Sequence, residues 1–191
     1  MKFVDKYYSQ TLEIKQSKFI AHAVAYSIYD KTLKELKETH PKARHFIVAY
    51  RYLNEFNQIV EHSSDDGEPK GTSGKPTLMV LQGRDIINSA IITVRYFGGT
   101  KLGTGGLVRA YSDAANLVFQ SAVLKEYKQE FFKTIIFNYT NLRRVEYECL
   151  ACGVEIIEKV FNDKTQYRLK SDENSMKKFL SKIDRMVNVI E

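Results

Sequence analysis

The segment SAIITVRYFGGTKLGTGGLVRAY, residues 89–111, runs from β-branched and aromatic residues through glycines into a helical pattern. Its first part, residues 89–97, is typical of a strand. Beyond the glycines, apolar side chains recur at the spacing of one helix face. These side chains are Leu107, Tyr111, Ala114, Val118 and Ala122. We therefore predict a strand, a glycine loop over residues 98–106, and a helix whose N-terminus abuts that loop.

The glycine run favours binding of an anion. Glycines let the backbone approach a ligand closely, and a helix start presents unpaired N–H groups at the positive end of its dipole. Arg95 precedes the run, Lys101 lies inside it and Arg109 follows one turn into the helix, so three cations could converge on one anion. The glycines concerned are Gly98, Gly99, Gly103, Gly105 and Gly106. The alternative is a tight turn that needs glycines for packing, with the cations on a solvated rim.

Known nucleotide-binding motifs do not fit this run. A P-loop requires Gly-Lys followed by Ser or Thr, whereas Gly74-Lys75 is followed by Pro76. A dinucleotide-binding fingerprint requires a third glycine where Val108 stands. The sequence LGTG at 102–105 is faintly similar to the phosphate loop of galactokinase-type kinases but lacks its serine pair. A phosphotransferase therefore stays a minor alternative.

A second candidate site is the loop HSSDDGEPKGTSGK, residues 62–75, which is too rich in Ser, Asp, Gly and Pro for a regular element. The loop and its adjoining hairpin supply three carboxylates and two histidines, which are Asp65, Asp66, Glu68, His45 and His62. A metal-dependent hydrolase could use such groups, since hard cations bind clustered oxygens and a base needs a tuned carboxylate or imidazole. The alternative is a polar loop whose Asp side chains cap turns, with Lys70 and Lys75 partly neutralising them.

The whole pattern indicates an α+β protein of two domains, residues 1–125 and 130–191, joined by a charged linker. The elements expected in the first domain, besides those above, are two strands or a hairpin within 13–26, a helix from an N-cap at Asp30 to before Pro41, strands at 44–51 and 58–61, and a short helix at 76–81. The elements expected in the second are strands at 131–139, 154–161, 165–170 and 186–190, and helices at 141–152 and 172–183. The resulting βαββαβ order predicts a ferredoxin-like domain.

Composition and cysteine usage narrow the function classes. The 29 Lys and Arg residues against 23 Asp and Glu give a formal net charge of +6, which suits a polyanionic partner without forming a basic tail. No signal-peptide core or bilayer-length apolar stretch is evident, so we expect a cytoplasmic protein without membrane contact. Cys149 and Cys152 lie late in an expected helix and have no further local ligands, so we expect neither a redox pair nor a zinc site. No metal and no cofactor are expected.

The two loops together, SSDDGEPKGTSGKP and VRYFGGTKLGTGGLVRAY, resemble the signature of the YigZ/IMPACT family, which usually has alanine where Ser73 stands. The resemblance is strong over residues 63–111 and looser upstream, at residues 17–19 and 43–45. It implies a first domain of βαβ fold like the second domain of ribosomal protein S-five and the fourth domain of elongation factor G. It also implies a ferredoxin-like second domain like that factor's fifth domain.

Both relatives contact RNA on the ribosome, so the resemblance implies a partner in RNA or the translation apparatus. Eukaryotic IMPACT restrains stress signalling to translation initiation through an additional RWD domain, so we expect only a general link to translation here. Our hypothesis is a non-catalytic protein that binds nucleic acid, RNA rather than DNA, or the ribosome and translation factors. The glycine backbone and five basic residues would form its anion-binding face, and these are Lys70, Lys75, Arg95, Lys101 and Arg109.

Two alternatives come from other classes of protein. One is an enzyme, either a hydrolase that uses His45 and the carboxylates of the loop or a phosphotransferase that uses the glycine run. The other is an adaptor whose loops dock on a ribosomal protein or a translation factor.

Overall fold

The computed structural model describes residues 1–190. The chain divides into two compact units, residues 1–127 and 128–191, and the division falls inside the charged stretch 125–130. Each unit has its own sheet and its own hydrophobic core. The predicted α+β class, with separate sheets, is therefore confirmed.

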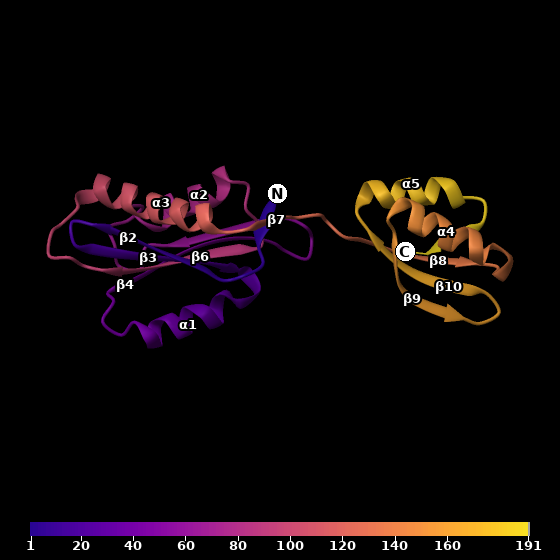
Figure 1. The fold of residues 1–191 in the computed structure, drawn as a ribbon, viewed down its shortest axis with the longest axis horizontal. Helices are drawn as coiled ribbons and strands as arrows, with labels where there is room; N and C mark the ends of the chain where they lie inside the picture. Colours follow the sequence, from indigo (N-terminus) through magenta and orange to yellow (C-terminus); the bar gives the residue numbers. More distant parts are fainter. Residues whose placement is uncertain (191) are drawn as a thin grey trace. The chain divides into compact units, whose positions relative to one another are not determined.

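The N-terminal unit is built on a five-stranded antiparallel sheet in the order β2-β3-β6-β4-β5. Its elements are β1 (Lys2–Val4), β2 (Tyr8–Ile14), β3 (Ser17–Ala25), η1 (Tyr26–Ile28), α1 (Tyr29–Thr39), β4 (His45–Leu53), β5 (Ile59–Ser64), α2 (Gly74–Gly83), β6 (Ser89–Tyr96), α3 (Gly103–Ser121) and β7 (Leu124–Glu126). Helices α2 and α3 cover one face of the sheet, and α1 covers the other (Figure 1). The β3-α1-β4 segment is a βαβ unit with β6 between its two strands.

Helix α3 buries an apolar stripe against the sheet, as its spacing predicted. Leu107, Tyr111, Ala114 and Val118 are all buried, whereas Ala122 follows the last helical residue. Burial of each large aliphatic side chain contributes about 1.5–3 kcal/mol. This packing holds α3 against the sheet.

Several boundaries differ from the prediction. Strand β5 continues to Ser64 and α2 begins at Gly74, so the irregular loop is confined to residues 65–73. Helix α3 begins at Gly103, so the second half of the glycine run is helical and not loop. Tertiary packing overrides the weak helix propensity of glycine here. Asp30 lies in the first turn of α1, whose N-cap is Ile28.

A short two-stranded sheet was missed from the sequence. Strand β1 pairs antiparallel with β7, and the Lys2 amide also donates to the carbonyl of Asp85. Three-residue strands carry too little periodicity to be recognised. The pairing holds the N-terminus beside the end of the first unit.

The C-terminal unit follows the predicted element order. It contains β8 (Phe131–Phe137), η2 (Tyr139–Asn141), α4 (Leu142–Cys152), β9 (Glu155–Phe161), β10 (Thr165–Ser171), α5 (Glu173–Ile183) and β11 (Val187–Ile190). The sheet is antiparallel with the order β11-β8-β10-β9, and both helices lie on one of its faces (Figure 1). Gly153 ends α4 in the left-handed conformation at φ 69°, which a glycine adopts without strain.

The two cysteines belong to the hydrophobic core of the C-terminal unit. Cys149 and Cys152 are buried in α4, and burial raises the pKa of the Cys149 thiol to about 12.

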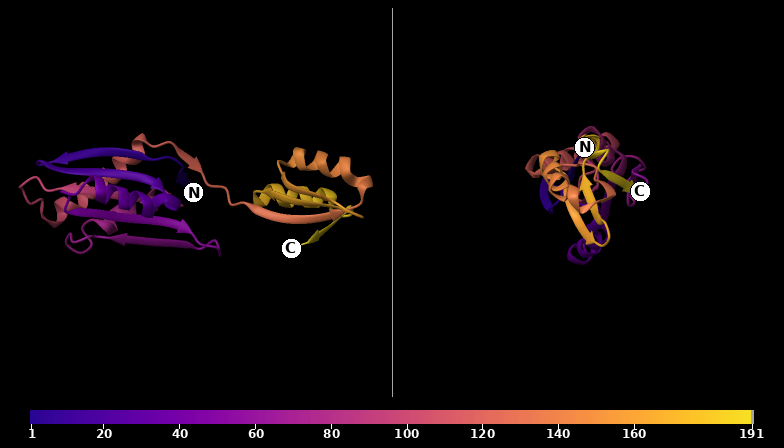
Figure 2. Two further views of the ribbon diagram at one scale, coloured as in Figure 1. Left: turned by 90° about the horizontal axis from the view of Figure 1, so that it is seen from below. Right: turned by 90° about the vertical axis from the view of Figure 1, so that its right-hand side faces the viewer.

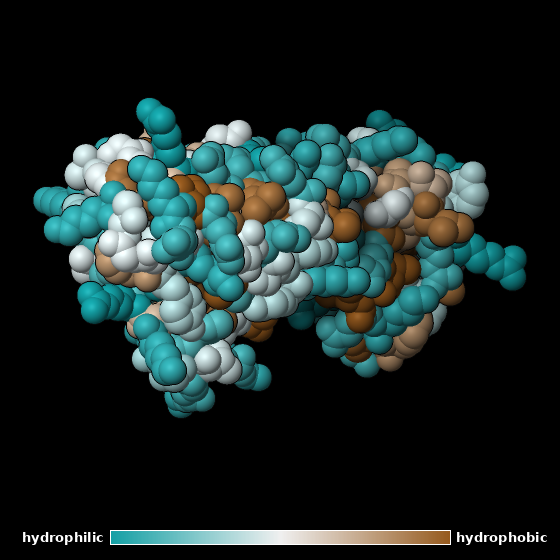
Figure 3. Space-filling model, turned by 60° about the vertical axis from the view of Figure 1, so that its left-hand side comes forward, coloured by the Kyte–Doolittle hydropathy of each residue, from teal (hydrophilic) through white to brown (hydrophobic). Residues whose placement is uncertain are grey.

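None of the helices within residues 1–190 combines the length and the apolar character that a bilayer-spanning segment requires. The face seen in Figure 3 is largely hydrophilic, with separate apolar patches between hydrophilic residues.

Candidate anion-binding site

The carboxylate of Glu68 is the centre of a buried network that joins four segments of the chain. Its Oε1 atom accepts a hydrogen bond from Nη1 of Arg95 and another, 2.8 Å long, from the hydroxyl of Tyr111. Nε2 of His45 lies 4.0 Å from the same oxygen. Glu68 and Arg95 are 4% and 7% exposed in their side chains, so the ion pair is shielded from water.

Burial and the neighbouring Glu68 carboxylate raise the pKa of Tyr111 far above its ordinary value. The hydroxyl of Tyr111 therefore keeps its proton and remains a hydrogen-bond donor. The guanidinium of Arg95 also lies against the ring of Phe19, with Cζ 5.3 Å from the ring centroid. The network thus ties the end of β6, the 65–73 loop and α3 into one unit.

Asp65 and Asp66 do not form a carboxylate cluster with Glu68. Asp65 accepts hydrogen bonds from the amides of Gly71, Ser73 and Gly74, at 2.7, 3.1 and 2.8 Å, and from the Ser73 hydroxyl at 2.7 Å. Burial pushes the pKa of Asp65 up, but these hydrogen bonds outweigh it and hold the pKa below its ordinary value. Asp65 therefore closes the loop and supplies negative charge at the start of α2.

Asp66 is also engaged in holding the loop in place. Its carboxylate accepts from the Phe46 amide at 2.6 Å, and its carbonyl lies 2.8 Å from Nδ1 of His45. His62 lies on β5 and stacks on Tyr50, with ring centroids 5.0 Å apart. Within residues 1–190 there is no group of three or more His, Cys, Asp or Glu side chains that could hold a metal ion. Turn capping describes the contacts of Asp65, whereas the Asp66 carboxylate bonds to the backbone of β4.

The glycine run has two halves with different roles. Gly98 is a packing glycine, since its amide donates to the Ser17 hydroxyl at 3.1 Å and it lies against the β2–β3 turn. Gly99 and Gly103 have positive φ angles of 87° and 72°, which let the chain turn from β6 into α3. Gly105 and Gly106 belong to the first turns of α3. The Gly98 amide is thus already used within the fold, and the amides at the start of α3 stay predicted anion donors.

Replacement of Gly98 by alanine is expected to destabilise the N-terminal unit by about 1–3 kcal/mol or more, because an added side chain cannot fit. A Cβ atom there would lie 2.0 Å from the Gln16 carbonyl carbon and 2.2 Å from the Ser17 amide nitrogen. At Gly105 such a Cβ would meet no atom within 4 Å apart from its chain neighbours and the adjacent helix backbone, so G105A is expected to be neutral or to stabilise α3 by up to about 1 kcal/mol. Urea unfolding of both variants checks this, and an equal effect of the two would contradict it.

The start of α3 opens onto a cavity of about 350 Å³. Its polar lining comes from Glu68, Arg95, Lys101 and Thr104. Arg95 is 5% exposed, and among residues 1–190 its Nε atom has no hydrogen-bond partner. Lys101 is exposed at the rim. The structure therefore brings two of the predicted cations, Arg95 and Lys101, to one pocket.

The other predicted basic residues are exposed and lie outside this lining. Arg109 is exposed in the second turn of α3. Lys70 follows Pro69, which lines the cavity, and Lys75 lies in the first turn of α2. Arg95 differs from all of them because it is buried and paired with Glu68. It therefore lies beneath the proposed face, while the lysines and Arg109 are free to contact a partner.

Figures 1 and 2 place the β6–α3 connection at one end of the N-terminal unit, away from β1 and β7. Nothing in the unit extends beyond this connection in either view.

Sequence reasoning treated Tyr111 only as a core residue and did not identify Ser17 or Phe97. The weak likeness at residues 17–19 was the available signal for Ser17.

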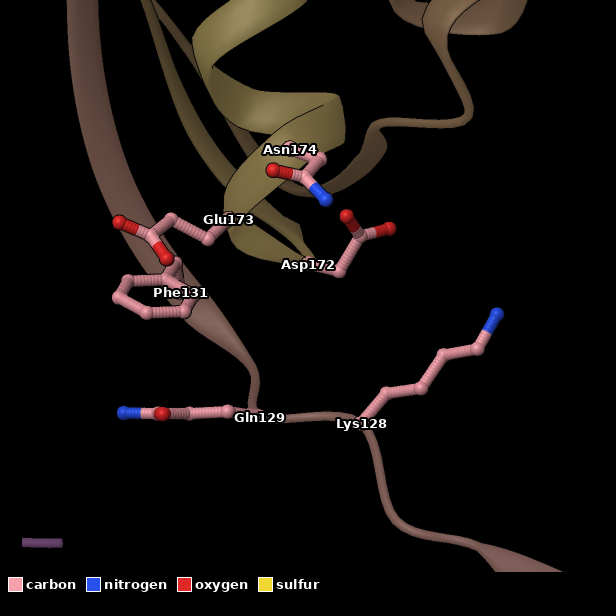
Figure 4. Close-up of a pocket in the computed structure, with 6 residues that line it drawn as sticks. All are labelled: Lys128, Gln129, Phe131, Asp172, Glu173 and Asn174. Carbon is pink, nitrogen blue, oxygen red and sulfur yellow. The ribbon is translucent and has the colours of Figure 1, made fainter. Parts of the chain in front are cut away.

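A second hollow, of about 410 Å³, lies at the start of α5 (Figure 4). Its lining combines Lys128 and Gln129 from the segment before β8 with Asp172, Glu173 and Asn174. Asp172 already serves as the N-cap of α5, because its carboxylate accepts from the Ser175 amide at 3.0 Å and from its hydroxyl at 2.8 Å. These hydrogen bonds hold the pKa of Asp172 below its ordinary value. Asp172 is therefore already engaged as a helix cap, and no predicted site residue lines this hollow.

Comparison with known proteins identifies the family. The Impact N-terminal domain model matches residues 15–119, which is more than half of the chain. An IMPACT family member from Haemophilus influenzae is 36% identical over 177 residues, covering 90% of this chain and 84% of that protein. The IMPACT family member YigZ of Escherichia coli is 34% identical over 148 residues, covering 76% and 72%.

One crystal structure, described as that of a hypothetical protein, covers 100% of this chain and 97% of its own, with 28% identity and a TM-score of 0.67. The two-domain α+β fold is therefore shared by a solved protein. The chain belongs to the IMPACT family, which confirms the resemblance drawn from its two loops.

Proposed function

We propose that this IMPACT family protein binds the phosphates of RNA at the start of α3, as a non-catalytic component of the translation apparatus or its regulation. The observation that carries the proposal is the pocket that Arg95 and Lys101 line beside the first turn of α3, which has no side-chain cap. Backbone amides at a helix start are natural donors to phosphate oxygens.

The charges at this helix start support the proposal. Helices α2 and α5 have a carboxylate at their N-termini, from Asp65 and Asp172, which complements the positive end of the dipole. Helix α3 has no acidic residue in its first turn and no capping side chain, and Lys101 precedes it. A cation there is unfavourable by about 0.3–1 kcal/mol. A bound anion would relieve this conflict, and conflicts of this kind are typical of functional sites.

The proposed fold relationships agree with this function. We infer that the N-terminal unit is related to the second domain of ribosomal protein S-five and the C-terminal unit to the ferredoxin-like fifth domain of elongation factor G. The βαβ unit of the first and the β11-β8-β10-β9 strand order of the second support these assignments. Phosphate contacts of this kind fix position without reading sequence.

The K101A/R109A double variant tests the proposal by filter binding to a structured RNA at fixed salt. Two lost phosphate contacts are expected to weaken binding about 10-fold or more. The matched control is K31A/K34A, which removes the same charge from exposed positions of α1 on the opposite face of the sheet. Equal binding by the wild type and both variants would reject the proposed face. Ribosome co-sedimentation that survives nuclease would instead favour a protein adaptor.

A further inference from the structure

The cavity at the start of α3 is larger than a phosphate group needs. Its volume of about 350 Å³ falls within the range of roughly 300–1,000 Å³ typical of small-molecule pockets. Beside its polar lining it has an apolar part that includes Phe97, Leu102 and Leu107. A bare phosphate would leave this part unused.

Phe97 supplies an accessible aromatic ring at the edge of the phosphate cradle. The residue is 46% exposed and follows the last residue of β6, so its side chain points to the same side as that of Arg95 two residues earlier. The Cζ atom of Arg95 lies 5.8 Å from the Phe97 ring centroid. The guanidinium therefore adjoins both the ring and the polar part of the pocket.

An aromatic ring beside an anion cradle matches the chemistry of a nucleotide, because every nucleobase has a face that stacks on such a ring. A base inside a continuous duplex cannot reach a pocket, whereas unpaired bases in loops, bulges and ends can. Arg95 is more than nine-tenths buried at the base of this pocket, and Lys101 adds an exposed cation to its lining.

We propose that this pocket holds one unstacked nucleotide of an RNA, with its phosphate at the first turn of α3 and its base against Phe97. The inference rests on the proposed RNA-binding function and adds to it the kind of RNA that is bound. Single-stranded segments are bound more tightly than duplex, and the preference comes from Phe97.

Filter binding with oligouridylate RNA, single-stranded or paired with oligoadenylate, tests this inference. F97L keeps apolar volume but removes the stacking ring, and is expected to weaken single-strand binding by about 5- to 100-fold. Duplex binding and the salt dependence should stay unchanged. The matched control is F56L in the β4–β5 turn, where Phe56 is 72% exposed and lies outside the pocket. Thermal unfolding of both variants checks that each remains folded.

The outcomes separate this inference from the proposed function. A loss of single-strand affinity in F97L alone supports it. Unchanged binding by F97L, together with weakened binding by K101A/R109A, overturns the nucleotide pocket and leaves the phosphate face. Equal affinity of the wild type for the single strand and the duplex also overturns the pocket. If neither variant changes binding, both proposals are wrong.

Discussion

Replacement of Glu68 by alanine is expected to lower the free energy of unfolding by about 3–5 kcal/mol, because it leaves a buried guanidinium without a counter-charge. The Arg95 side chain is 7% exposed, and Tyr111 would lose its hydrogen-bond acceptor at the same time. Such a loss is a large fraction of the roughly 5–15 kcal/mol that stabilises a typical domain. Urea unfolding followed by circular dichroism measures it.

The control is Glu130→Ala, which also removes a carboxylate from an ion pair. The Glu130 carboxylate lies 2.7 Å from Nζ of Lys170, but its side chain is 53% exposed. Loss of this exposed pair is expected to cost no more than about 1 kcal/mol. A second variant, Glu68→Leu/Arg95→Met, removes both buried charges and is expected to be less destabilised than Glu68→Ala alone. If Glu68→Ala loses as little as the control, the network does not hold the loop and β6 together.

Stability is expected to fall as the pH drops from about 6.5 towards 4, because His22 is protonated in the unfolded chain but stays neutral in the folded protein over this range. His22 is 3% exposed; burial, and then the nearby His40, lower its pKa from 6.5 to about 4. Between these pH values the unfolded chain binds the extra proton, so the unfolding free energy decreases as pH falls. The full shift corresponds to about 3 kcal/mol, at about 1.4 kcal/mol per pH unit.

The contacts of His22 indicate which variant should be compared with the wild type. Its Nδ1 lies 2.5 Å from the Tyr7 hydroxyl, and among residues 1–190 its Nε2 has no hydrogen-bond partner. His22→Gln keeps a polar group for Tyr7 but does not titrate, so its stability should be flatter between pH 6.5 and 5. Urea unfolding at a series of pH values checks this. Parallel pH profiles for wild type and variant would show that another group causes the slope.

The elements that sequence reasoning predicted best are those with strong local signals. The buried strand β6, the apolar stripe of α3 and the whole element order of the C-terminal unit could be read from periodicity and turn residues. Gly153 marked the end of α4 because a left-handed residue was required there. The short β1–β7 pair depends on contacts between distant residues and left no such signal.

The candidate site could be predicted in its location but not in its internal roles. The residue types indicated the two loops, but three neighbouring carboxylates in the sequence point to three different sets of partners in space. Asp65 closes its own loop, Asp66 contacts Phe46, and Glu68 neutralises Arg95. Sequence proximity could not distinguish these roles, because the partners of Asp66 and Glu68 come from other strands and from α3, whereas those of Asp65 come from its own loop and the start of α2. The boundary between turn and helix within the glycine run likewise depends on tertiary packing, so the sequence alone did not predict it.

The salt dependence of RNA binding tests the central claim, the phosphate contacts at the start of α3, most directly. For a single-stranded RNA, each phosphate contact contributes about 0.7 to the slope of log affinity against log salt concentration. K101A/R109A is therefore expected to bind with a slope about 1.4 smaller in magnitude than that of the wild type. The claim would be contradicted if K101A/R109A and the control K31A/K34A both kept the slope of the wild type.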